Sequence, residues 1–181
     1  MTDMERAVVD IRIAEGRDVA AIQAIYAGHV LNGLATFEEV PPDVAEIARR
    51  REDVLALGLP YLVAEAEGRV LGYAYAAPFR ARSAYRFTVE DSVYLDPAAT
   101  GRGIGGRLLV RLIEDCTARG ARQMLAVIGD SGNAASIAVH ARAGFRPAGT
   151  FRAVGFKFGR WVDTVQMQRQ LGPGDGTLPE R

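Results

Sequence analysis

The chain has 181 residues, with 22 lysines and arginines against 22 aspartates and glutamates, so its formal net charge is zero. This balance argues against nucleic-acid binding, which usually needs a basic surplus, and 49% hydrophobic with 24% charged residues excludes a largely disordered chain. It has neither the roughly 18-residue apolar run of a transmembrane helix nor, near its start, a secretory signal. The single cysteine, Cys116, excludes an internal disulfide and a multi-cysteine zinc site. We therefore expect one soluble cytoplasmic domain without metal, nucleic-acid or membrane partners.

The first third of the chain predicts a strand followed by two helices. Apolar and polar residues alternate over residues 8–13, which is the period of a half-buried strand. Asp18 is the expected cap of a helix that ends at Gly33. After two prolines, Asp43 and Glu46 have the spacing of a capping box, which predicts the start of a second helix.

The rest of the chain predicts strands interleaved with two more helices. The expected strands cover residues 61–65, 70–77, 87–95, 124–128, 145–151 and 161–167, and the expected helices cover residues 103–119 and 133–143. Glu67 and Gly68 have the composition of a hairpin turn. This order describes a single α/β domain over residues 1–171, with a mixed, mostly antiparallel central sheet and about four flanking helices. The glycines and prolines of residues 172–181 predict a flexible tail.

Residues 100–106 form a glycine cluster between a predicted strand and a long amphipathic helix. Glycines let the backbone approach a bulky anion, and the first amides of a helix attract negative charge, so the cluster predicts a phosphate or pyrophosphate site. Gly101, Gly103 and Gly106 also match the dinucleotide-binding fingerprint, but the hairpin and two helices before them are the wrong context for a Rossmann fold. The remaining alternative is that the glycines have only a structural role and let the helix pack tightly.

Several motifs together resemble one family of enzymes. Two pairs of segments carry the first part of the resemblance: residues 93–97 with 101–106, and residues 133–136 with 140–145. Five further short blocks carry the second part, at residues 36–38, 88–90, 92–94, 126–128 and 155–161. The pairs resemble the acetyl-CoA motifs of the GNAT N-acetyltransferase superfamily. The blocks resemble its phosphinothricin and methionine sulfoximine (methionine sulfone) N-acetyltransferases. The resemblance spans nearly the whole chain and implies a single-domain GNAT-like fold with acetyl-CoA as the co-substrate.

The resemblance assigns acetyl-CoA contacts to the strand before the glycine cluster, to the cluster and to the start of a later helix. The residues are Val93, Tyr94, Leu95, Gly101, Arg102, Gly103, Ile104, Gly105, Gly106 and Asn133. The backbone amide of Val93 is the candidate oxyanion donor, and Asn133 also fits a helix N-cap. Thr100 stands where the family usually has Arg or Gln. We therefore expect pyrophosphate binding to depend on backbone amides, with Arg102 as a compensating cation.

Glu90 is the candidate general base, because amine acetylation needs a neutral nitrogen and an acceptor for its proton. It lies in the middle of a predicted strand, where an isolated carboxylate would be costly in a core, and the resemblance implies the same role. Alternation puts Glu90 with Ser92 and Tyr94 on a polar face that lines a cleft. Asp91 interrupts the apolar face, which predicts a β-bulge at this point. A surface carboxylate on an exposed strand face is the alternative.

His140 and Cys116 are the other reactive side chains. The resemblance places His140 where many GNAT members have a tyrosine proposed to protonate the leaving thiolate, and an imidazole can supply that proton. A histidine that is only hydrogen-bonded in place is the alternative. Cys116 could accept an acetyl group, but it shares an apolar helix face, so we expect it in the core.

The segment before Glu90 suggests the chemistry of the acceptor. Residues 79–86 carry three arginines, whose guanidinium groups match carboxylate and phosphinate-like oxygens, although a solvated basic loop is the alternative. The resemblance assigns acceptor contacts to Arg80, Ala81, Arg82, Glu90, Asp91 and Ser92. It also implies a homodimer and direct acetylation of the α-amino group of phosphinothricin-like, methionine sulfoximine-like or methionine sulfone-like amino acids. The alternatives are an enzyme that acetylates another small amine or a protein N-terminus, and a non-catalytic acyl-CoA-binding module.

Overall fold

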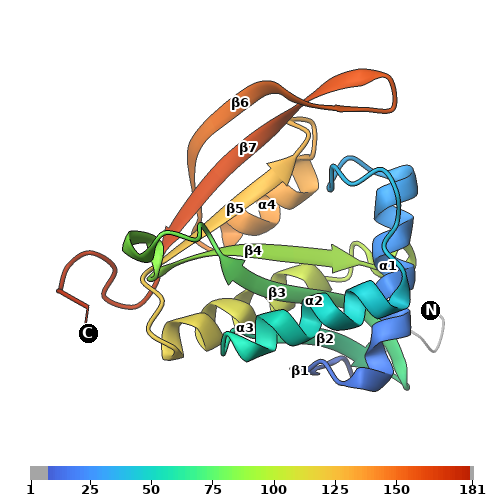
Figure 1. The fold of residues 1–181 in the computed structure, drawn as a ribbon, viewed down its shortest axis with the longest axis horizontal. Helices are drawn as coiled ribbons and strands as arrows, with labels where there is room; N and C mark the ends of the chain where they lie inside the picture. Colours follow the sequence, from blue (N-terminus) through green and yellow to red (C-terminus); the bar gives the residue numbers. More distant parts are fainter. Residues whose placement is uncertain (1–7, 180–181) are drawn as a thin grey trace.

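The computed structural model describes residues 8–179, which form a central sheet with helices on both faces (Figure 1). The N-terminal segment is expected to contain no secretory signal, and most of that segment lies outside the described residues. The described strands are β1 (Asp10–Ile13), β2 (Tyr61–Ala66), β3 (Arg69–Pro78), β4 (Thr88–Leu95), β5 (Gln123–Gly129), β6 (Arg146–Lys157) and β7 (Arg160–Gln170). The described helices are α1 (Val19–Asn32), α2 (Val44–Ala56), α3 (Ile104–Ala118) and α4 (Ala134–Arg142). The predicted order of elements is confirmed.

The sheet is mixed and mostly antiparallel, as predicted. Its strand order is β1-β2-β3-β4-β5-β7-β6, and only the central β4–β5 pair is parallel. That pairing ends at Asp91 and Ala126, whereas β5 continues to pair with β7 as far as Gly129. The two central strands therefore separate toward their carboxyl ends, as Figure 1 shows.

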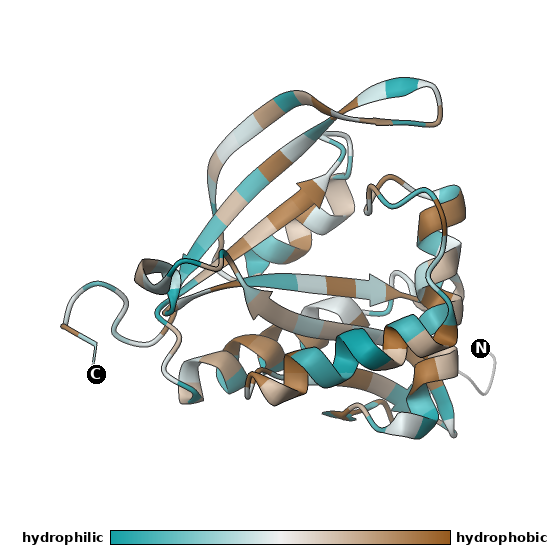
Figure 2. Ribbon diagram, in the orientation of Figure 1, coloured by the Kyte–Doolittle hydropathy of each residue, from teal (hydrophilic) through white to brown (hydrophobic). Residues whose placement is uncertain are grey.

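The helices divide between the two faces of the sheet. The helix α1 packs against β3 and β4 and α2 against β2 and β3, whereas α3 contacts β1 to β4 and α4 contacts β5. Each face has its own apolar core. Figure 2 shows β5 as largely hydrophobic, and its Met124 is fully buried. Cys116 is also fully buried, and burial raises the pKa of its thiol to about 12, so the prediction of a core cysteine is confirmed.

The helix caps differ in part from the prediction. The Asp18 carboxylate does not cap α1, because it is buried against the guanidinium of Arg12, at 2.7 and 2.8 Å. Asp43 does cap α2, since its Oδ1 accepts from the backbone amide of Glu46 at 2.8 Å. The Glu46 carboxylate pairs with Arg49 and Arg50 instead of completing the box. In both cases a nearby guanidinium competes for a carboxylate, because charge-assisted hydrogen bonds are the stronger ones.

The last two strands are longer than predicted, because bulges let β6 continue. The register of β6 against β7 shifts twice, and the amide of Ala153, which has a positive φ, donates to Asp163 Oδ1 at 2.8 Å. The hairpin turns at residues 67–68 and 158–159 both have positive φ at two successive residues, as a type I′ turn requires. The tail beyond β7 contacts the domain, since Arg122 donates to the Gly174 carbonyl at 3.1 Å. No helix within residues 8–179 is long and apolar enough to cross a membrane.

Candidate active site

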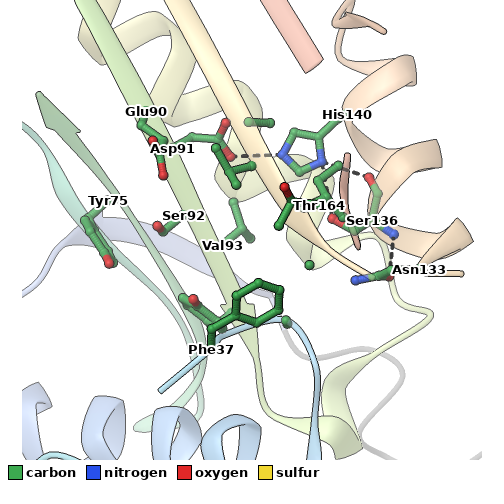
Figure 3. A pocket seen from close by; sticks show the side chains of 16 residues that line it. Phe37, Tyr75, Glu90, Asp91, Ser92, Val93, Asn133, Ser136, His140 and Thr164 are labelled. Atoms are coloured by element: carbon green, nitrogen blue, oxygen red, sulfur yellow. Dashed lines mark hydrogen bonds and ion pairs between the residues drawn. The ribbon is translucent and has the colours of Figure 1, made fainter. Parts of the chain in front are cut away.

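A cavity of about 300 Å³ lies where β4 and β5 separate. Residues 90–94 of β4 form one wall and residues 126–129 of β5 form another. The helix α4 with its N-cap, part of the segment between α1 and α2, and the side chains of Tyr75 from β3 and Thr164 from β7 complete it (Figure 3). A strand edge that has lost its neighbour offers backbone groups to a ligand, so this gap can hold an extended molecule by strand-like contacts.

Glu90 lines this cavity and is half-buried. Burial, followed by the neighbouring Asp91 carboxylate, raises the pKa of Glu90. Within residues 8–179 its carboxylate has no hydrogen-bond or ion-pair partner. The cavity therefore contains a carboxylate that can accept a proton and that is not committed to a structural interaction.

Asp91 and His140 form a buried, hydrogen-bonded pair beside Glu90. The Nε2 of His140 lies 2.9 Å from Asp91 Oδ2, and the two side chains are 6% and 2% exposed, respectively. The His140 Nδ1 donates to the Ser136 carbonyl at 2.8 Å. Burial lowers the pKa of His140, but the Asp91 carboxylate and the Ser136 carbonyl together raise it by more, so the net shift is upward. Both nitrogens face acceptors, and the imidazole is therefore stabilised in its protonated form.

The predicted bulge at residues 90–91 is wrong. The pairing of β4 with β3 runs without a shift from Val89 to Leu95. Asp91 stays in the regular strand and is accommodated on the buried face by its pair with His140, a residue 49 positions later. The face that carries Glu90, Ser92 and Tyr94 lines the cavity, as predicted. Asp91 and Val93 of the other face line it too, because β4 loses its neighbour here.

Three of the residues expected to contact the coenzyme line the same cavity: Val93, Tyr94 and Asn133. Asn133 is also the N-cap of α4, since its Oδ1 accepts from the Ser136 amide at 3.2 Å. The ring of Tyr94 packs edge-on against Tyr26 at 5.2 Å between centroids. Tyr94 therefore reaches the cavity while its ring belongs to the α1 side of the sheet.

The glycine cluster lies at the start of α3, outside the residues that line this cavity. Gly101 and Gly103 have φ of +75° and +76°, and Gly103 is the N-cap of the helix without a side-chain cap. A Cβ at Gly101, Gly103 or Gly106 would meet nothing within 4 Å. The cluster therefore has open space and uncapped helix amides, which together fit a pyrophosphate. The Thr100 hydroxyl donates to the Pro97 carbonyl at 2.9 Å, so it is used within the turn.

The remaining predicted residues of the cluster and the acceptor loop lie elsewhere. Gly103 and Gly106 line a second hollow of about 500 Å³ beside α3 and α4, and Arg102 lines a third near β3. Arg80, Ala81 and Arg82 are exposed in the loop between β3 and β4 and are not among the residues that line the cavity. The Arg80 guanidinium lies 5.0 Å from the centre of the Phe79 ring. Ser92, in contrast, lines the cavity with Glu90 and Asp91.

Several cavity residues were not predicted from the sequence, notably Tyr75, Ser136 and Thr164. Figure 3 shows Phe37 across the cavity from Glu90 and Asp91. These side chains come from segments far apart in the chain, and periodicity alone carries no signal for them. Within residues 8–179 no group of three or more histidine, cysteine or acidic side chains could hold a metal ion.

Comparisons with known proteins find relatives by sequence and by fold. The acetyltransferase (GNAT) domain family matches residues 11–166. A phosphinothricin N-acetyltransferase of Alcaligenes faecalis is 56% identical over 98% of this chain and 90% of its own length. An L-methionine sulfoximine/L-methionine sulfone acetyltransferase of Pseudomonas aeruginosa is 44% identical over 90% of this chain and 95% of its own. A crystal structure of a phosphinothricin acetyltransferase from Sinorhizobium meliloti with acetyl-CoA has a TM-score of 0.93 at 51% identity, covering 96% of this chain and 94% of that one.

Proposed function

The chain belongs to the GNAT acetyltransferase family, and we propose that it transfers the acetyl group of acetyl-CoA to the α-amino group of a small amino acid. The proposed acceptors are phosphinothricin-like, methionine sulfoximine-like and methionine sulfone-like amino acids, because relatives of both kinds match nearly the whole chain. The observation that carries the proposal is the unpartnered, half-buried carboxylate of Glu90 at the gap between β4 and β5.

The residues proposed to hold acetyl-CoA fit its chemistry. The coenzyme would supply the acetyl group as a thioester. Val93, Tyr94 and Leu95 follow the point where β4 loses its pairing with β5, so this edge suits an extended pantetheine arm. The open start of α3 suits the pyrophosphate, with Arg102, Ile104 and the glycines of residues 101–106 around it. Asn133 lines the intervening cavity.

Glu90 is the proposed proton acceptor for the amine. An ammonium group cannot attack, so a base must remove a proton before or during the transfer. The upward shift in the pKa of Glu90 makes it a better base than an exposed glutamate and suits it to work nearer neutral pH. The backbone amide of Val93 is the proposed donor to the developing oxyanion.

His140 is the proposed proton donor to the leaving thiolate. Its pair with Asp91 favours the protonated ring, which is the form a donor needs. Because both nitrogens already have protein partners, donation requires Nε2 to exchange Asp91 for the sulfur. If His140→Ala keeps its activity, the ring has only a structural role.

Charge and surface features support the rest of the proposal. Arg80, Ala81 and Arg82 remain proposed contacts of the acceptor, with the two guanidinium groups pairing with its acidic group. Asp91 and Ser92 also remain proposed contacts of the acceptor. We also propose a homodimer. The edge strand β6 and its hairpin partner expose aromatic side chains, with Phe156 56% and Trp161 68% exposed. A solution mass that stays near 19.5 kDa in light scattering would contradict the dimer.

A panel of amines, assayed by release of free thiol from acetyl-CoA, tests the function directly. We expect release only with an amino-acid acceptor, and most strongly with the three proposed classes. Glu90→Gln should lower kcat about 100- to 10,000-fold, the range for loss of a general base, with little change in acetyl-CoA affinity. Preference for another amine or a protein N-terminus would overturn the acceptor class. Binding of acetyl-CoA without any transfer would overturn the enzymatic function.

A further inference from the structure

Lys157 is the single lysine of the chain, and it is buried. The other 21 basic residues are arginines. Lys157 ends β6 and is 1% exposed. Its Nζ donates to the backbone carbonyl of Gly33 at 2.8 Å and to that of Thr36 at 2.9 Å, and it lies 4.9 Å from the centre of the Phe158 ring. Burial lowers the pKa of Lys157, an effect that Glu39 and Glu38 partly offset.

A compact ammonium suits this place better than a guanidinium. An ammonium directs three donors to separate points, whereas a guanidinium is a flat fork. Two of the Lys157 donors reach carbonyls three residues apart in one loop, and the aromatic ring covers a further side. Burying a charged group is costly unless it is satisfied, so these contacts commit Lys157 to holding this loop.

The loop of residues 33–38 is pressed against the sheet at two further points. At the end of β5, a Cβ on Gly129 would lie 2.1 Å from the Leu34 carbonyl oxygen. In β6, a Cβ on Gly155 would lie 2.3 Å from an atom of the Phe37 ring. Both positions must be glycine for the loop to sit this close. Together with Lys157, they fix the loop to strands that follow it by more than 90 residues.

This loop forms the wall of the active-site cavity that faces Glu90. Ala35 and Phe37 line the cavity, and Figure 3 shows Phe37 opposite Glu90 and Asp91. The loop joins α1 to α2, on the other side of the sheet from α3 and α4, where the proposed coenzyme residues of the glycine cluster and Asn133 lie. Its wall therefore belongs to the acceptor side of the cavity.

We propose that Lys157 is a positioning residue that sets the acceptor wall. It does not line the cavity, and it acts through the loop by holding Ala35 and Phe37 at the distance that a small acceptor requires. The acceptor assignment rests on the proposed function. Loss of Lys157 should loosen the wall and weaken binding of the amine, while the glycine cluster and Asn133, on the opposite side of the sheet, keep their positions.

The test compares Lys157→Met with two other variants of β6. Methionine keeps the length of the side chain and removes its donors. Gly155→Ala displaces the Phe37 ring by a second route, and Arg152→Met is the matched control, because the Arg152 side chain is 84% exposed. We expect at least a tenfold rise in acceptor KM for Lys157→Met, a smaller rise for Gly155→Ala and no change for Arg152→Met. The acetyl-CoA KM and kcat should change less than threefold in all three.

Hydrogen exchange gives a readout that does not depend on activity. Backbone amides of residues 33–38 should exchange at least tenfold faster in Lys157→Met, with α3 and α4 unchanged. The proposal would be overturned if Lys157→Met left the acceptor KM unchanged and the loop amides still protected from exchange. It would also be overturned if this variant exchanged faster throughout the chain and had raised KM values for both the acceptor and acetyl-CoA. If the wild type acetylates no amine, the proposed function fails on its own, while the exchange experiment still decides whether Lys157 holds the loop.

Discussion

Replacing Asp91 by asparagine tests whether the buried pair with His140 is an ion pair. The substitution keeps the size of the side chain and removes its charge. The two side chains are 2% and 6% exposed, and Asp91 is the anion that His140 contacts, at 2.9 Å. Without that anion, burial outweighs the remaining contribution of the Ser136 carbonyl and lowers the pKa of His140 below its ordinary value of 6.5.

The expected cost follows from breaking a buried pair on one side. At pH values where the ring is charged in the wild type, removing Asp91 leaves His140 either as an uncompensated buried charge or forced to lose its proton, which costs about 3 to 5 kcal/mol. For a domain of this size each kcal/mol corresponds to roughly 2 to 4 °C in Tm, so Tm should fall by about 6 to 20 °C. The loss should depend on pH, because the folded pKa of His140 is raised in the wild type. The stabilisation is then complete below about pH 6.5 and is lost as the pH rises through that folded pKa.

The assay is thermal unfolding of wild type and variant between pH 5.5 and pH 9. Asp18→Asn is the matched control, because Asp18 is also buried but pairs with Arg12, which keeps its charge over this range. The difference between wild type and Asp91→Asn should be largest at the acid end and shrink toward pH 9. The difference for Asp18→Asn should stay constant.

A cost for Asp91→Asn that is independent of pH, or smaller than about 1 kcal/mol, would refute the reasoning. Either result would mean that His140 is neutral in the folded protein. It would then only donate a hydrogen bond to Asp91, and it would lack the protonated form that a proton donor in catalysis needs.

Three further predictions concern the glycine cluster, the cysteine and the base. Gly103→Ala should weaken acetyl-CoA binding about 5- to 30-fold, as measured by calorimetry, because alanine at φ +76° costs about 1–2 kcal/mol. Gly16→Ala is the control and should bind normally, because Gly16 has open space around it and no positive φ. Cys116→Ala should keep kcat, since the buried thiol takes no part in transfer; a loss of kcat without loss of Tm would contradict this. The kcat/KM of the wild type should fall as the pH drops through the raised pKa of Glu90, and Glu90→Gln should abolish that limb.

Local signals in the sequence determined the elements and part of the site. Hydrophobic period, turn residues and stop glycines act over a few neighbours, so they predicted the order of strands and helices and the cap at Asp43. The glycine cluster could be recognised for the same reason, because positive φ and open helix amides are properties of a short segment. Glu90 could be singled out as a candidate because an isolated carboxylate in the middle of a strand would be costly in a core.

The tertiary structure decided how the chemistry is assembled. The pairing of β4 with β5 ends at Asp91, and this opening places both faces of β4 at the cavity, which the alternation of a continuous strand cannot predict. Asp91 satisfies its charge with His140, 49 residues away, instead of forming a bulge. Lys157 holds the carbonyl of Thr36 across 121 residues. Strand separation, buried charge and loop position depend on which distant groups meet, and only the folded packing determines that.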